Sequence, residues 1–183
     1  MNQDFRDNGT SPIGEMKMDD VQTNADRLFF QADGLIKDGR IVDARNLLEQ
    51  CIQKYPTHGR SYNHLGWLHQ EKYKDFASAE KYFLKALEYS PEYPAVYKNF
   101  AFCLSTQRKF DQLEKLLEKA LNTSGVDHSF VYEEYAIMYE LQGDYVLAIK
   151  YFTEFAKATL DQKLVSNAMR AIDRCKQKSD FAL

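Results

Sequence analysis

The chain has 183 residues, of which 44% are hydrophobic and 28% are charged, a composition typical of one soluble globular domain. No apolar run approaches the roughly 20 residues that a membrane-spanning helix needs, and the first residues lack a basic stretch followed by an apolar one. We therefore expect no membrane insertion and a cytoplasmic location. A net charge of −3 argues against a nucleic-acid partner, because phosphate-binding surfaces cluster Lys and Arg.

The first predicted elements are a tail and two helices. Residues 1 to about 22 lack helical periodicity, and we predict that they form a mobile tail. A first helix is predicted over residues 23–37, with Thr23 as its N-cap. The segment 38–40 contains aspartate and glycine, and it is predicted to turn the chain into a second helix over about 42–54.

Rows of similar residues then recur along the chain at steps of 34 or 35 residues. One row is uniformly small and holds Ala32, Gly66, Ala101 and Ala136. Three further rows hold Ala44, Ala79, Leu113 and Ala148; Leu48, Phe83, Leu117 and Phe152; and Cys51, Ala86, Ala120 and Phe155. A single period shared by several rows indicates a repeated structural unit.

The segment 63–91 carries this pattern most completely, with Leu65-Gly66, Ala79, Phe83, Ala86 and Pro91. In type and spacing these residues resemble the tetratricopeptide repeat, a helix–turn–helix unit of about 34 residues. The resemblance implies an all-α fold, an α-solenoid of four repeats wound as a right-handed superhelix. The repeats are predicted within residues 23–159, at about 24–58, 59–93, 94–127 and 129–159, followed by a C-terminal capping helix over 160–178 and a short tail over 179–183.

The small and large residues have a physical role in this fold. Two antiparallel helices cross closely where one presents a small side chain, and we expect Gly66 to face Ala79 at such a crossing. Large residues such as Phe83 are expected to fill the space against the neighbouring repeat. Leu113 stands where the family has alanine, so the third repeat is predicted to pack with an offset.

The resemblance also implies a function. Tetratricopeptide arrays are typically adaptors or scaffolds whose first helices line a concave groove that receives a peptide or a helix of a partner protein. We therefore expect a non-catalytic protein-binding module without a cofactor. The positions that the family geometry places in the groove are Asp26, Phe29, Asp33, Ile36, Arg60, Asn63, His64, Trp67, Gln70, Lys98, Asn99, Phe102, Ser105, Phe130, Glu133, Ile137 and Glu140.

The chemistry of these positions predicts the kind of ligand. Basic, amide and aromatic side chains lie in the middle of the groove and carboxylates at both ends, which favours a ligand with an acidic or polar centre and basic flanks. One family specialisation, the clamp for the C-terminal carboxylate of a heat-shock chaperone, needs basic and Asn residues at five positions. Here those positions hold Phe29, Asp33, His64, Ala95 and Asn99, so we do not expect that activity.

Other functions find less support in the sequence. The four histidines show no metal-ligand spacing, and Cys51, Cys103 and Cys175 form no paired motif, which favours buried free thiols. The carboxylates Glu133, Glu134 and Glu140 lack an accompanying nucleophile or histidine, so we interpret them as a solvated helix face. Two alternatives stay open: a chaperone for an export substrate, as in type III secretion, and a structural component that assembles with itself as a homo-oligomer.

Overall fold

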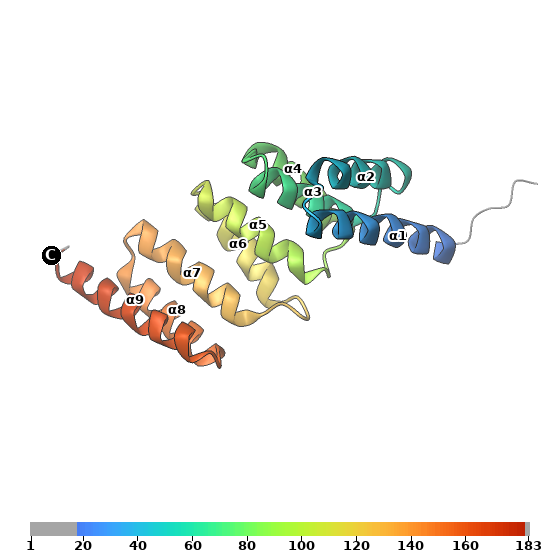
Figure 1. Cartoon of the computed structure of the whole chain (residues 1–183). Coiled ribbons are helices and arrows are strands. Elements are labelled where there is room, and N and C mark those ends of the chain that lie inside the picture. The colour runs from blue at the N-terminus through green and yellow to red at the C-terminus, as the bar shows by residue number, and fades with distance from the viewer. Residues whose placement is uncertain (1–17, 182–183) are drawn as a thin grey trace, which may run out of the picture.

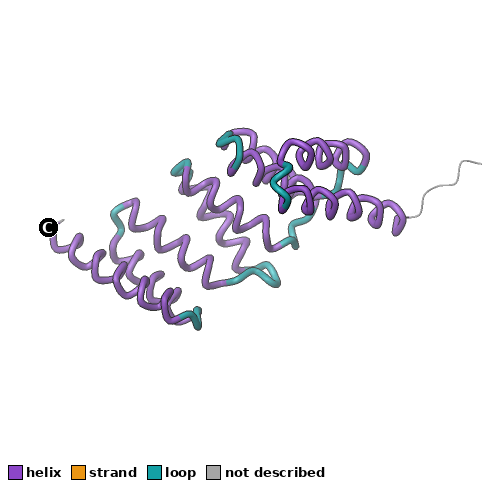
Figure 2. The backbone as a smooth tube through the Cα atoms, in the orientation of Figure 1, coloured by secondary structure: helices purple, strands orange, loops and turns teal. Residues whose placement is uncertain are grey.

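The structure is a computed structural model that describes residues 18–181, with side chains described from residue 21 onward. Within this range the chain consists of nine α-helices joined by short loops, without a strand (Figure 2). Their bounds are α1 Met18–Lys37, α2 Ile41–Lys54, α3 Gly59–Glu71, α4 Phe76–Tyr89, α5 Pro94–Thr106, α6 Phe110–Leu121, α7 His128–Gln142, α8 Tyr145–Ala158 and α9 Gln162–Phe181. None of these helices is long and apolar enough to cross a membrane.

The helices pack as successive hairpins, α1 with α2, α3 with α4, α5 with α6 and α7 with α8, and α9 then covers α8. Figure 1 shows the hairpins arranged side by side, with the two ends of the described chain at opposite ends of the molecule. The first helices α3, α5 and α7 also contact one another in order, which makes them one continuous face. The predicted all-α solenoid is confirmed.

The start of α1 differs from the prediction. The helix begins at Met18, so Thr23 lies inside it and is not an N-cap. At the other end α9 continues to Phe181. The remaining parts of the predicted tails, residues 1–17 and 182–183, lie outside the described residues.

The crossing of α3 and α4 is organised by a glycine and a phenylalanine. A Cβ atom added to Gly66 would lie 2.6 Å from Cε1 of Phe83, whose side chain is fully buried. The Phe83 ring also stacks on Phe100 of the next hairpin, with ring centroids 5.6 Å apart. The missing side chain of Gly66 thus accommodates the ring of Phe83. That Gly66 also faces Ala79 stays a prediction.

The hairpin α5–α6 packs less extensively than α3–α4 or α7–α8. Its second helix carries Leu113, fully buried, in the row where the other hairpins have Ala44, Ala79 and Ala148. Because a leucine side chain at a helix crossing keeps the two backbones apart, the substitution of a large residue for a small one accounts for the looser packing.

The turns inside the hairpins share one backbone conformation. Gly39 and Gly143 have φ values of 75° and 82°, in the left-handed region that glycine adopts without strain. In the two central hairpins the same position is held by Lys74 and Arg108, with φ values of 54° and 55°. A side chain in this conformation costs about 1 to 2 kcal/mol, so the central turns are strained where the outer ones are not.

Candidate functional site

A cavity of about 240 Å³ lies on the face formed by the first helices, and we call it the groove pocket. Side chains from α1, α3 and α5 and from the loop before α5 surround it. Its lining residues are Asp33, Ile36, Asn63, His64, Trp67, Tyr93, Ala95 and Asn99. The structure thus brings together six positions that the family geometry assigned to the groove, and it adds Tyr93 and Ala95.

Two asparagines from neighbouring helices form a hydrogen-bonded pair in the groove pocket. Asn99 Nδ2 donates to Asn63 Oδ1 over 3.1 Å, and Asn63 is almost fully buried. The pairing uses one donor and one acceptor, and no further hydrogen bond joins Asn63 Nδ2 or Asn99 Oδ1 to the residues that the structure describes. One amide donor and one amide acceptor therefore remain for a ligand, a combination that suits a peptide group.

The opposite side of the groove pocket is acidic. Asp33 accepts from Lys37 Nζ over 2.7 Å and lies 3.5 Å from His64 Nε2. The hydrogen bond from Lys37 is the main cause that lowers the pKa of Asp33, whereas burial lowers the pKa of His64. At neutral pH the carboxylate is therefore charged and the imidazole neutral, which disfavours a carboxylate ligand at this point.

Phe29, predicted as a groove contact, lies beneath the surface with only 3% of its area exposed. The guanidinium of Arg60 lies 4.5 Å from the centroid of the Phe29 ring, and its Nη1 is 3.1 Å from Asp26 Oδ1. Phe29 therefore supports Arg60 and forms no open surface itself. The exposed aromatic ring in this region is that of Phe30, which is 57% exposed. The family geometry assigns the preceding residue, Phe29, to the groove, so Phe30 was not predicted.

A second group of predicted residues lies where α5 meets α7. Lys98 and Phe102 are exposed on α5, and Glu133 and Ile137 are half-buried on α7. No ion pair joins Lys98 to the residues that the structure describes. Glu134 was not predicted to belong to this group, although the adjacent carboxylates were a visible signal in the sequence.

From the sequence we interpreted Glu133 and Glu134 as part of a solvated helix face, but in the structure these two carboxylates on α7 are not ordinary solvated groups. Burial raises the pKa of Glu133, and burial together with the charge of Glu133 raises the pKa of Glu134 to about 7. The positive charge of Lys98 acts in the opposite direction on both. A carboxylate that is poorly solvated and incompletely neutralised favours the approach of a cation.

Three predicted groove residues are occupied or covered. Glu140 accepts from Arg174 Nε and Nη2 over 2.7 and 2.6 Å and from Lys178 Nζ over 2.8 Å, so it fastens α9 to α7. These hydrogen bonds hold the pKa of Glu140 at about 2. Asp26 is engaged by Arg60 and His58, and Gln70 is only 2% exposed. The expected carboxylate flanks of the groove are therefore reduced to Asp33 and the pair on α7.

A cluster at the junction of the first two hairpins has the order of a hydrolytic triad. Ser61 Oγ lies 2.8 Å from His58 Nδ1, and His58 Nε2 lies 3.1 Å from Asp26 Oδ1. Ser61 is completely buried and also donates to Cys51 Sγ over 3.3 Å. A nucleophile has to touch its substrate, so this arrangement serves to join α1, α2 and α3 rather than to carry out chemistry.

The described residues offer little for metal or thiol chemistry. No group of three or more His, Cys, Asp or Glu side chains among them is placed to hold a metal ion. All three cysteines are free and buried, and burial raises the pKa of each thiol, to about 11 for Cys103. Buried thiols with raised pKa values are poor nucleophiles, because the thiolate is the reactive form.

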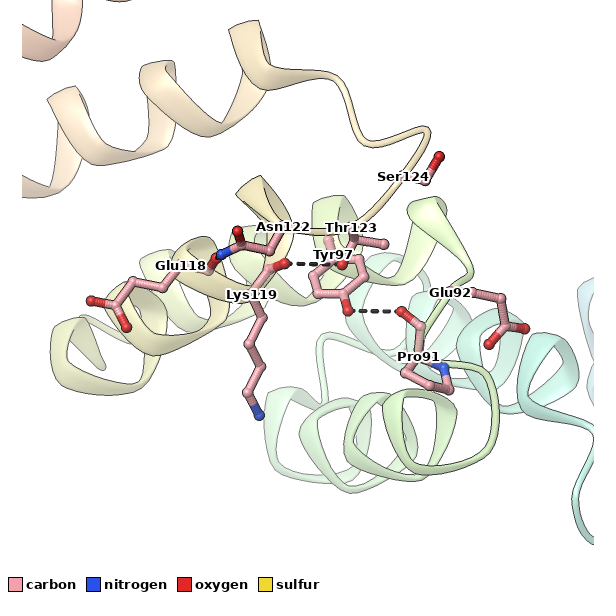
Figure 3. A pocket seen from close by; sticks show the side chains of 8 residues that line it. All are labelled: Pro91, Glu92, Tyr97, Glu118, Lys119, Asn122, Thr123 and Ser124. Carbon is pink, nitrogen blue, oxygen red and sulfur yellow. Dashed lines mark hydrogen bonds between the residues drawn. The ribbon is translucent and has the colours of Figure 1, made fainter.

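A larger hollow of about 640 Å³ opens between the loop after α4 and the end of α6 (Figure 3). It is lined by Pro91, Glu92, Tyr97, Glu118, Lys119, Asn122, Thr123 and Ser124. The Tyr97 hydroxyl donates to the Pro91 carbonyl over 2.7 Å, and the Thr123 hydroxyl donates to the Lys119 carbonyl over 2.9 Å. Both hydroxyl donors are thus already used within the chain, which makes this hollow a weaker candidate than the groove pocket.

Comparison with known proteins places the fold among tetratricopeptide-repeat structures. PilF of Pseudomonas aeruginosa is similar over 87% of this chain and 75% of its own, with 16% identity and a TM-score of 0.74. PilW, described as a widely conserved type IV pilus biogenesis factor, is similar over 87% and 80%, with 20% identity and a TM-score of 0.65. TTC0263, a thermophilic tetratricopeptide-repeat protein of Thermus thermophilus, is similar over 84% and 86%, with 15% identity and a TM-score of 0.62. No family model and no curated protein matches the sequence. The class of protein is therefore defined by the fold.

Proposed function

We propose that the protein is a non-catalytic scaffold that binds an extended segment of a partner protein along the face of its first helices. The observation that carries this proposal is the Asn63–Asn99 pair in the groove pocket, with one donor and one acceptor left for a peptide backbone. Trp67 lines the same pocket and supplies the rigid aromatic surface that peptide sites favour. The similarity to PilF and PilW supports a protein-interaction role through the shared fold.

The charged groove side chains that are not paired within the chain indicate which kind of ligand to expect. Arg60 and Glu140 are already paired within the chain, so neither is left to select a partner. Glu133 and Glu134 remain, near the single positive charge of Lys98. The ligand proposed here has a plain polypeptide backbone at the asparagines, an apolar side chain against Trp67 and a basic side chain toward α7. The predicted cytoplasmic location is part of the proposal, and the free buried thiols support it.

Selection from a random peptide library displayed on phage tests this proposal. Peptides that bind the wild-type protein are expected to lose about tenfold or more in affinity for Asn99→Ala and for Trp67→Ala, since each removes a side chain that lines the groove pocket. Val146→Ala, at an exposed position on the second helix α8, is the matched control and should bind as the wild type does. Selected peptides that bind both groove variants at full strength would refute the proposal.

The pH dependence of the same peptides tests the basic side chain. Glu134 is charged only above its pKa of about 7, so affinity for a lysine-containing peptide should rise between pH 6 and 8. In Glu134→Gln the rise should disappear while the affinity below pH 6 stays close to that of the wild type. A pH profile that is unchanged by this substitution would show that the cation is not recognised there.

A further inference from the structure

A second cavity, of about 230 Å³, lies among α4, α5 and α6, and we call it the second-helix pocket. It is lined by Glu80, Leu84, Leu87, Phe100, Leu104, Gln112, Lys115, Leu116 and Lys119. None of these residues lines the groove pocket. Leucine and phenylalanine side chains make its walls: Leu104 and Leu116 are buried, and Leu84 is 53% exposed. A pocket below about 300 Å³ is small for an organic ligand but is suited to a protruding side chain.

The pocket lies beside the hairpin α5–α6, whose two helices pack less extensively than those of α3–α4. The buried Leu113 of this hairpin holds the position that alanine has in the other hairpins. Leu84 and Leu87 of α4 and Leu116 of α6 line the pocket. Burial of this apolar surface by a bound apolar group is favourable, because it removes the surface from water.

The charges around the pocket are unbalanced. Glu80 is neutralised by Lys109 and also accepts from Gln107 Nε2 over 3.4 Å. Lys115 and Lys119 are exposed, one turn apart on α6, and neither forms an ion pair with any residue that the structure describes. Like charges four residues apart on a helix repel each other, and nearby carboxylates would relieve that repulsion.

We propose that the second-helix pocket binds an amphipathic helix of a partner protein, which inserts one leucine or phenylalanine between α4 and α6 and places glutamates or aspartates beside Lys115 and Lys119. The apolar side chain fills the pocket between the leucines of α4 and α6. The acidic residues select the partner by charge. This site shares no lining residue with the groove pocket, so a substitution can change the lining of one site and leave that of the other intact.

The test uses a synthetic amphipathic peptide that presents a Leu-Phe pair on one face with glutamates one turn to either side. Its twin carries lysines in place of the glutamates. Binding to the full chain is followed by methyl NMR, where the signals of Leu84, Leu87 and Leu104 should shift and saturate with the acidic peptide alone. Fluorescence anisotropy gives the affinities.

Charge exchange provides the decisive variants. Lys115→Glu combined with Lys119→Glu should weaken the acidic peptide about tenfold or more and should create binding of the basic twin. Leu84→Glu, at an exposed position, should also weaken the acidic peptide, and it keeps the test valid if the double variant folds poorly. Lys163→Glu on α9 is the matched charge control, and Asn99→Ala tests the other site; both should bind as the wild type does.

Three results would overturn the proposal: no shift of the pocket methyls, equal binding of the acidic peptide and its basic twin, or shifts centred on the groove pocket. A fourth is self-association of the protein alone, seen by analytical ultracentrifugation, that shifts the same leucine methyls and is lost in the double lysine variant. That result would show that the second-helix pocket binds a second copy of this chain and not a different partner. Because the groove variant is measured in parallel, failure here leaves the proposed peptide site untouched.

Discussion

The hairpins α3–α4 and α5–α6 have the same layout and neighbouring places in the solenoid, yet they pack differently. In α3–α4 the absence of a side chain at Gly66 lets the ring of Phe83 lie directly against the α3 backbone. In α5–α6 the buried Leu113 replaces the alanine of the other hairpins, and Leu104 and Leu116 line the second-helix pocket together with Leu84 of α4. The comparison teaches that residue size in the repeat rows distinguishes a closely packed hairpin from a looser one, since Gly66, Ala79 and Phe83 correspond to Ala101, Leu113 and Leu117.

Loss of the ring at the closed crossing should have the largest effect. Phe83→Ala removes a fully buried side chain that touches Gly66 and stacks on Phe100, and we expect it to cost about 3 to 5 kcal/mol of unfolding free energy. Urea unfolding followed by circular dichroism measures the change. If Phe83→Ala lowered the free energy of unfolding by less than Leu113→Ala does, the view that α3–α4 is the better packed hairpin would be contradicted.

Removal of the bulky residue at the open crossing should cost less. For Leu113→Ala we expect about 2 kcal/mol, at the low end for buried leucines, because α6 has room to move toward α5 and refill the space. The same movement should narrow the second-helix pocket and weaken the acidic peptide. Equilibrium unfolding and peptide affinity are measured on one preparation. Full peptide affinity in a folded variant would mean that Leu113 does not hold the pocket open.

Addition of one methyl group at the closed crossing should have a moderate effect. In Gly66→Ala the new Cβ would lie 2.6 Å from the Phe83 ring, and the resulting overpacking exceeds the gain in helix propensity by about 1 kcal/mol. In a Phe83→Leu background, Gly66→Ala should cost much less unfolding free energy than it does in the wild type. Thermal unfolding of the four proteins forms the cycle. An additive result would show that the two positions do not communicate.

Substitutions in the turns of α3–α4 and α5–α6 should change the stability least, and by the same amount in both hairpins. Lys74→Gly and Arg108→Gly each relieve a left-handed backbone, and after the entropy cost of glycine we expect each to stabilise by about 0.5 kcal/mol. The measurement is the thermal midpoint. Destabilisation by either substitution would show that its side chain contributes more than the backbone strain costs.

The repeat rows predicted most of the core. Ala44, Leu48 and Cys51 are fully buried, as are their counterparts Ala148 and Ala79, because residue size at a fixed helical period is a local property of the chain. Leu113 was recognised as the large residue of its row for the same reason, and the offset predicted from it stays a prediction. The start of α1 was missed because the stretch before Thr23 has little apolar periodicity of its own, and the helix extends through it all the same.

The groove was predicted less completely, because its composition depends on pairs formed across helices. Six predicted positions line the groove pocket, among them Asn63, Trp67 and Asn99. Glu140 was assigned to ligand binding, but its partners Arg174 and Lys178 lie 34 and 38 residues later in the chain. Arg174 lies one repeat period after Glu140, but their pairing also requires α9 to lie against α7, which the repeat rows did not predict.

By itself the sequence determined that this chain is a helical solenoid and which side of each helix is buried, because the order of small and large residues specifies which surfaces can approach. Only the tertiary structure decided which polar side chains stay free for a partner, since Arg60 and Glu140 are satisfied by distant residues. It also decided that side chains of α4, α5 and α6 line one apolar pocket, because a cavity is a property of several packed helices.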